Sequence, residues 1–192
     1  RTFVEKVGLA KADSTVDIAM LEDCVRDDLG VSAPRTMAVL DPLKIVFTNV
    51  PDNWSDTLTM ENHPDKPEMG TRDITISKTI YIERDDFSLN PPPKYFRLRV
   101  GGEVRLKGAY IIRCDRVVAE GDDVKYLECT LDLDTRSGSP GADRKVKGTI
   151  HFVDAQNCLP FEGRLYDQLM TAEWDEADAA DKKDVTRFLS ED

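Results

Sequence analysis

The stretch KYFRLRVGGEVRLK, residues 94–107, alternates apolar and charged side chains on both sides of a Gly-Gly pair. A period of two is typical of strands that have one face on a core and the other in water. We therefore predict two strands here whose apolar side chains are Phe96, Leu98, Val100, Val104 and Leu106. A three-residue connection with a left-handed glycine keeps most of this apolar set on one side, and it sets Arg97 opposite Arg105.

The polar face of this stretch is basic. It carries five cations against the single acid Glu103, in a chain whose formal net charge is -11: Lys94, Arg97, Arg99, Arg105 and Lys107. Together with Tyr95, such a face suits stacking on unpaired bases and binding of phosphates. An ordinary solvated strand face is the alternative. Because opposed arginines repel each other unless an anion lies between them, we expect that removing either one barely lowers the stability of the free protein.

The acidic residues are concentrated at the end of the chain. The last twenty residues hold eight acids against three cations, 8 − 3 = 5 negative charges, which is about half of the net charge. An acidic remainder repels non-specific nucleic acid and leaves one basic face for the right partner.

Composition and motifs limit the function classes. The 192 residues, of which 40% are hydrophobic, fit one soluble globular domain, and no apolar run approaches the ~20 residues of a membrane span. The cysteines lack metal-ligand spacing, so we expect buried free thiols in a reducing compartment: Cys24, Cys114, Cys129 and Cys158. Without a phosphate-binding glycine loop or a nucleophile motif, we predict no catalytic residue and no metal ligand. His63, in a proline-rich loop, is expected to be a hydrogen-bonded loop residue.

Helical patterns precede the strands. The chain begins at Arg1 inside such a pattern, which indicates a fragment of a longer protein. Ser14 and Asp17 resemble a capping box for an amphipathic helix from Val16 to Leu29, with Gly30 as its C-terminal cap. We expect this helix to pack at the edge of the strand domain.

Eight or so short strands follow, separated by turn signals. They begin at Met37, continue through 72–84 and two runs around a turn at Gly121-Asp122, and end with strands in 145–153 and 160–169, beyond a loop at 137–143. A helical fragment is expected at 184–189. This spacing predicts a mainly β fold, a closed or nearly closed antiparallel barrel.

Five segments, in order, resemble the C-terminal half of glutaminyl-tRNA synthetases. They are APRTMAVLDPLKIVFTNV from residue 33, NHPDKPEMGTR from 62, IYIERDDF from 80, KYFRLRVGGEVRLKGAYII from 94 and KVKGTIHFV from 145. The resemblance extends from Phe3 to about Tyr166. It implies the end of a helical subdomain in residues 1–33, a ribosomal protein L25-like proximal anticodon-binding β-barrel in 34–170, and an acidic connector toward a distal barrel in 171–192.

The resemblance also implies a function. The parent protein would be a class I aminoacyl-tRNA synthetase that attaches glutamine to its tRNA, with ATP and Mg²⁺ bound by a catalytic half that lies upstream of Arg1. This chain would hold no cofactor, would be inactive alone, and would recognise the anticodon stem-loop of glutamine tRNA. We expect a cytoplasmic monomer that binds neither membrane nor DNA.

Site residues are carried over only where positions match. The resemblance implies anticodon contacts at Arg35, Lys94, Tyr95, Arg97, Arg105 and Lys107, and phosphate contacts at Lys145 and Lys147. Some relatives have arginine where this chain has Lys107, lysine where it has Phe96, and glutamine where it has Lys94. Two alternatives stay open: the same module from a glutamyl-tRNA synthetase, and a non-enzymatic L25-type RNA-binding barrel.

Overall fold

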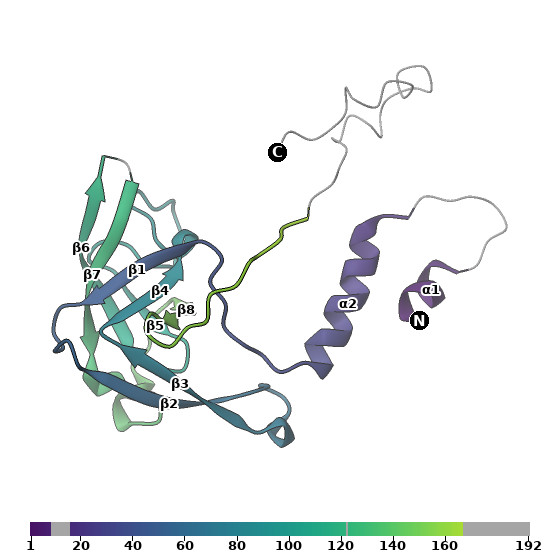
Figure 1. The fold of residues 1–192 in the computed structure, drawn as a ribbon, viewed down its shortest axis with the longest axis horizontal. Coiled ribbons are helices and arrows are strands. Elements are labelled where there is room, and N and C mark those ends of the chain that lie inside the picture. The colour runs from purple at the N-terminus through teal and green to yellow at the C-terminus, as the bar shows by residue number, and fades with distance from the viewer. Residues whose placement is uncertain (9–15, 122, 167–192) are drawn as a thin grey trace, which may run out of the picture. The chain divides into compact units, whose positions relative to one another are not determined.

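A curled seven-stranded sheet dominates the molecule (Figure 1). The computed structural model describes residues 1–8, 16–121 and 123–166. The order of strands in the sheet is β8-β5-β6-β7-β1-β4-β9, and β2 and β3 form a second, two-stranded sheet. The strands are β1 Pro42–Phe47, β2 Ser55–Glu61, β3 Thr71–Ser77, β4 Thr79–Glu83, β5 Glu103–Leu106, β6 Ile111–Glu120, β7 Asp123–Asp132, β8 Thr149–Ile150 and β9 Val153–Asp154. The predicted mainly β class is confirmed.

The large sheet is mixed, so the prediction of a purely antiparallel barrel is wrong. Most neighbouring strands are antiparallel, but β1 pairs with β7 and β5 pairs with β8 in parallel. Alternation of apolar and polar residues reports which face of a strand is buried, and it is the same for both strand directions. Both parallel pairs join strands that are distant in sequence, where no turn signal indicates the direction.

The core lies on the inner face of the sheet. Alternate residues of β1 are buried, namely Leu43, Ile45 and Phe47, and they meet buried Ile80 and Ile82 of β4. The predicted burial of alternate isoleucines in 72–84 is thus confirmed, with a break between β3 and β4. Of the four free cysteines, three are buried as predicted and Cys158 is partly exposed.

Two α-helices, α1 Thr2–Val7 and α2 Ile18–Ser32, precede the strands. Asp17 caps α2, because its carboxylate accepts a hydrogen bond from the Ala19 amide. Ser14 lies outside the described residues. The predicted end at Gly30 is wrong: the helix ends at Ser32, before an extended Ala33 that precedes a proline and is therefore disfavoured in helical conformation. Cys24 is the buried residue of α2, whereas most of its apolar face is exposed, so the predicted packing of that face is not observed among the described residues.

The predicted hairpin at 94–107 does not form. Residues 95–100 run beside the 3₁₀-helix η2 (Arg84–Asp86): the Leu98 amide donates to the Asp86 carbonyl and the Ser88 amide donates to the Leu98 carbonyl. Gly101, with a φ of 70°, and Gly102 then turn the chain into β5. Leu98 is buried but Phe96 and Val100 are half exposed, so the predicted core set is only partly correct.

The remaining segments are short. The predicted loop at 137–143 contains the 3₁₀-helix η4 Pro140–Asp143 and follows the 3₁₀-helix η3 Leu133–Thr135, and a further one, η1, spans Pro67–Met69. The predicted strand at 160–169 is wrong for residues 160–166, which have no regular structure, and its end lies outside the described residues, as do 171–192 and the predicted helix at 184–189. None of the described helices has the length and apolarity needed to cross a membrane.

Candidate nucleic-acid interface

Two stretches of the chain meet along the β8–β5 edge of the large sheet. The Arg105 amide donates to the Gly148 carbonyl at 2.9 Å, and the Lys107 amide donates to the Ile150 carbonyl at 2.8 Å. The Lys147 ammonium lies 5.5 Å from the centre of the Phe96 ring. Residues 94–107 and 145–147 therefore approach each other at this edge, and we call these two stretches the cationic edge.

Most cations of this surface have no acidic partner. Five exposed side chains form no ion pair with any residue in 1–8, 16–121 or 123–166: Lys94, Arg99, Lys107, Lys145 and Lys147. In contrast, the arginines of β6 are paired, Arg113 with Asp115 and Arg116 with Glu128. The cationic edge thus presents uncompensated positive charge on an acidic protein, which favours an anionic ligand.

Arg97 is anchored by a buried acid. Its guanidinium pairs with Oδ1 of Asp86, whose side chain is only 3% exposed, while that of Arg97 is 53% exposed. The other carboxylate oxygen of Asp86 is buried and has no hydrogen-bond partner within the described part of the chain. The Arg97 guanidinium is therefore held on one side by Asp86, while about half of the side chain remains exposed to solvent.

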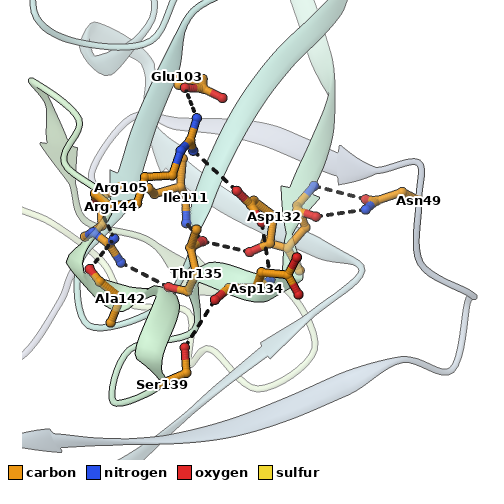
Figure 2. Close-up of polar contacts among 11 residues, drawn as sticks. Asn49, Glu103, Arg105, Ile111, Asp132, Asp134, Thr135, Ser139, Ala142 and Arg144 are labelled. Carbon is orange, nitrogen blue, oxygen red and sulfur yellow. Dashed lines mark hydrogen bonds and ion pairs between the residues drawn. The ribbon is translucent and has the colours of Figure 1, made fainter.

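Arg105 is bonded within the fold. Its two terminal nitrogens donate to three backbone carbonyls, at 3.2 Å to Thr135, 2.8 Å to Ala142 and 3.0 Å to Arg144 (Figure 2). Within the sheet it pairs with Ile111 of β6 and Thr149 of β8, so the prediction that Arg105 lies opposite Arg97 is wrong. The physical reason is that the arm before Gly101 follows η2 and not β5. The expectation that removing either arginine barely lowers stability rested on that pairing of Arg97 with Arg105 and is wrong with it, because each arginine is bonded within the fold. Arg105 holds the η3–η4 loop against the strand.

A polar network surrounds that loop (Figure 2). Arg144 bridges two acids, Glu103 at 2.6 Å and Asp132 at 3.3 Å, and the hydrogen bond to Glu103 raises the pKa of Arg144. The Thr135 hydroxyl accepts from the Ile111 amide at 2.8 Å and donates to the Asp132 carbonyl at 2.7 Å. The loop is thus rigidly connected to the end of the β6–β7 pair.

Tyr95 and Lys94 enter the cationic edge from a proline-rich segment. The Tyr95 hydroxyl donates to the Asp85 carbonyl at 3.1 Å, and burial together with the charge of Asp85 raises the pKa of Tyr95. Lys94 is exposed and has a positive φ of 67°, which turns the chain out of the segment 91–93. Both residues precede Arg97 in the chain, and their predicted contact with RNA stays a prediction.

Arg35 lies apart from the other predicted contacts. It donates from Nη2 to the Gly30 carbonyl at 3.1 Å, and its amide donates to the Asn62 carbonyl at 2.7 Å. His63 is buried beside it, with Nε2 2.9 Å from the Gly30 carbonyl and Nδ1 accepting from the Asp65 amide at 3.1 Å. His63 is therefore the hydrogen-bonded loop residue that the sequence predicted, and Arg35 makes no contact with the cationic edge in the described ranges.

The family of the chain follows from comparison with known proteins. A model of the family described as class I tRNA synthetases (E and Q), anti-codon binding domain, matches residues 33–132, which is 100 of 192 residues. The chain belongs to this family. The match contains the cationic residues of 94–107 together with Arg35, and it ends before Lys145 and Lys147.

Two relatives of this anticodon-binding domain extend the similarity over most of the chain. A glutamine–tRNA ligase of Clostridium perfringens is 52% identical over 177 residues, 92% of this chain and 32% of the relative. A glutamine–tRNA ligase of Salmonella newport is 46% identical over 172 residues, 89% of this chain and 31% of the relative. The chain spans about a third of the length of the curated relatives it matches.

Sequence reasoning missed three features of this anticodon-binding domain. It placed Phe96 in the core, it named Arg99 among the cations but not among the candidate contacts, and it gave Asp86 no role. The exposure of Phe96 follows from the breaks on both sides of 94–100, three prolines before it and two glycines after it, which interrupt a regular strand. The burial of Asp86 has no sequence signal, because an aspartate beside a second aspartate is normally exposed.

Proposed function

We propose that this chain recognises the anticodon stem-loop of glutamine tRNA as part of a glutaminyl-tRNA synthetase. The observation that carries the proposal is the cationic edge, where five exposed cations have no acidic partner in the described part of the chain although the net charge is -11. Nucleic acid supplies the missing negative charge, and the family to which the chain belongs is named for anticodon binding.

The roles of the individual residues follow from their surroundings. Arg97 reads a base, because its guanidinium is anchored on one side and open to solvent on the other, and unpaired bases expose edges that accept paired hydrogen bonds. Tyr95 and Lys94 flank it. Arg105 contributes by holding the η3–η4 loop in place and offers its remaining donors to the ligand. Lys107, Lys145 and Lys147 bind phosphates, which positions the loop without selecting its sequence.

The activity of the parent protein is part of the same proposal. Glutamine, ATP and Mg²⁺ would be bound by the catalytic part of a class I synthetase, which acts as a cytoplasmic monomer, and this chain alone would activate no amino acid. The family covers enzymes for glutamate and glutamine, and identity of about half to glutamine–tRNA ligases favours glutamine. The L25-type ribosomal alternative finds no support in these relatives.

Binding to synthetic stem-loops tests the proposal. Fluorescence anisotropy compares the glutamine anticodon loop with loops that carry one changed anticodon base. We expect the wild-type chain to prefer the cognate loop, and Arg97→Gln to reduce that preference by about 1–3 kcal/mol, the range of a bidentate base contact. Arg113→Gln, in which the paired arginine of β6 is lost, is the matched control. Equal affinity of the wild-type chain for all loops would refute anticodon recognition.

Amino-acid activation provides an independent test. The purified chain should show no glutamine-dependent exchange of pyrophosphate into ATP, because its sequence has no recognisable loop for the phosphates of ATP. The full-length enzyme is the positive control. A glutamine-dependent signal from this chain would contradict the assignment of the chemistry to the missing part.

A further inference from the structure

Phe96 is an aromatic side chain in an unusual position. It is 50% exposed in the middle of the cationic edge, between Tyr95 and Arg97. The Lys147 ammonium lies 5.5 Å from its ring centre, so one face of the ring interacts with a cation while half of the residue stays exposed. An exposed phenyl ring beside a lysine that forms no ion pair among the described residues has no evident role in the stability of the barrel.

The backbone around Phe96 is fixed on both sides. The Tyr95 hydroxyl is bonded to the Asp85 carbonyl, and the Leu98 amide and carbonyl are bonded to Asp86 and Ser88. Gly148 passes so close that a Cβ there would lie 1.8 Å from the Phe96 carbonyl oxygen. The fold thus holds Phe96 in one place and directs its ring outward, which reduces the loss of conformational entropy when a ligand packs on it.

The surroundings select the kind of ligand. Packing a protein surface on this ring would remove water from Lys94, Lys145 and Lys147, which have no acidic partner within 1–8, 16–121 and 123–166, and burying charges without partners is unfavourable. Single-stranded RNA meets both requirements, because its bases stack on aromatic rings and its phosphates neutralise cations. A base stacked on the open face of Phe96 leaves Lys147 beside the sugar-phosphate backbone.

We propose that Phe96 is a stacking platform for one unpaired base of the anticodon loop, with Lys147 orienting the ring and binding the adjacent phosphate. This inference rests on the proposed function and adds to it a contact that hydrogen bonding by arginine does not supply. Stacking accepts any base, so the platform contributes affinity and placement of the loop, while Arg97 contributes the choice of base.

A double-mutant cycle between protein and RNA tests the platform. Anisotropy measures binding of the glutamine anticodon stem-loop and of variants in which each loop nucleotide in turn is abasic. Phe96→Leu keeps an apolar side chain and removes the ring, and we expect it to weaken binding of the intact loop roughly tenfold. At one loop position, the abasic RNA should bind the wild-type chain roughly tenfold more weakly than the intact RNA does. The Phe96→Leu variant should bind that abasic RNA and the intact RNA equally well.

Controls separate the platform from the proposed function. Phe96→Tyr should retain the affinity, and Phe161→Leu, which removes another exposed ring, should leave it unchanged. Two outcomes would contradict the platform: Phe96→Leu binds the loop as tightly as wild type, or it loses affinity by the same factor at every abasic position. If the wild-type chain still prefers the cognate anticodon in that case, the proposed function stands. If the wild-type chain shows no preference among the loops, the proposed function fails and the platform fails with it.

Discussion

The β6–β7 strand pair and the cationic edge are neighbours in one sheet, and they differ in whether their positive side chains are paired with acids. Both arginines of β6 are paired with an acid, Arg113 with Asp115 and Arg116 with Glu128, the latter through two nitrogens at 2.8 and 2.9 Å. Lys125 likewise lies near Glu120 and Asp123. Along the cationic edge, five exposed cations have no such partner among the described residues.

This difference distinguishes charges that serve the fold from charges that serve a ligand. A neutralised pair on a strand surface adds solubility and a small amount of stability, and it attracts no polyanion. Uncompensated like charges raise the free energy of the folded chain slightly, and binding of an anion removes this repulsion. The comparison therefore supports the proposed ligand-binding role of the cationic edge and a structural role for the charges of β6 and β7.

The largest expected effect concerns the two kinds of arginine pair. Arg97→Ala leaves the buried carboxylate of Asp86 without its partner, so we expect the free energy of unfolding to fall by about 2–4 kcal/mol, below the full range for a buried pair because Arg97 is half exposed. The matched variant Arg116→Ala breaks an exposed pair and should lower it by no more than about 1 kcal/mol. Urea denaturation of both variants measures the difference. Equal losses would mean that the Asp86 pair is an ordinary surface pair.

A smaller effect is expected at the boundary between the two regions. Arg105→Ala removes three hydrogen bonds from a charged donor to backbone carbonyls, and we expect a loss of about 1.5–3 kcal/mol. Hydrogen exchange should show faster exchange in residues 135–144, while β6 stays protected. Arg105→Lys should recover little of the stability lost in Arg105→Ala, because an ammonium lacks the planar fork that reaches all three carbonyls. Unchanged exchange in this loop after Arg105→Ala would contradict the anchoring role.

The smallest expected effect concerns another set of paired side chains, Tyr110, Asp56 and Arg136. Burial and the 2.6 Å hydrogen bond to Asp56 raise the pKa of Tyr110 to about 12. Because this is above the ordinary value of 10.0, the protonated phenol stabilises the fold below pH 10, and that contribution is lost as the pH rises toward 12. Ultraviolet titration should show a late phenolate step that disappears in Tyr110→Phe and persists in Tyr166→Phe, which removes the hydroxyl of an exposed tyrosine.

Asp56, the acid of the same cluster, depends on pH in the opposite direction, because its pKa is lowered. Burial opposes ionisation of Asp56, but hydrogen bonds from Arg136 and Tyr110 outweigh it and lower the pKa of Asp56 below its ordinary value of 3.8. The ionised carboxylate therefore stabilises the fold above pH 3.8, and this contribution is lost as the pH falls through the lowered pKa. Asp56→Asn should show a weaker fall of stability in acid than wild type. An identical acid profile would contradict the assignment.

Local patterns predicted the parts of this molecule that local physics determines. The alternation in β5 placed Val104 and Leu106 in the core correctly, and the isoleucines of β4 likewise. The same alternation failed for Phe96, because residues 95–100 join a neighbouring 3₁₀-helix and leave the predicted hairpin. Whether Arg97 or Arg105 is free or bonded depends on Asp86 and on the carbonyls of the η3–η4 loop, which come close only in the folded chain.

The central claim is that the cationic edge, and not the net charge of the chain, binds RNA. Two triple variants, each of which removes three positive charges, test it: Arg99→Gln, Lys107→Gln and Lys145→Gln in one, and Arg113→Gln, Arg116→Gln and Lys125→Gln in the other. The measurement is the salt dependence of binding to the glutamine anticodon stem-loop. We expect the first variant to lose roughly tenfold or more in affinity, with a slope of log affinity against log salt that is smaller by about 2, and the second to match wild type. Equal losses in both variants would contradict the claim.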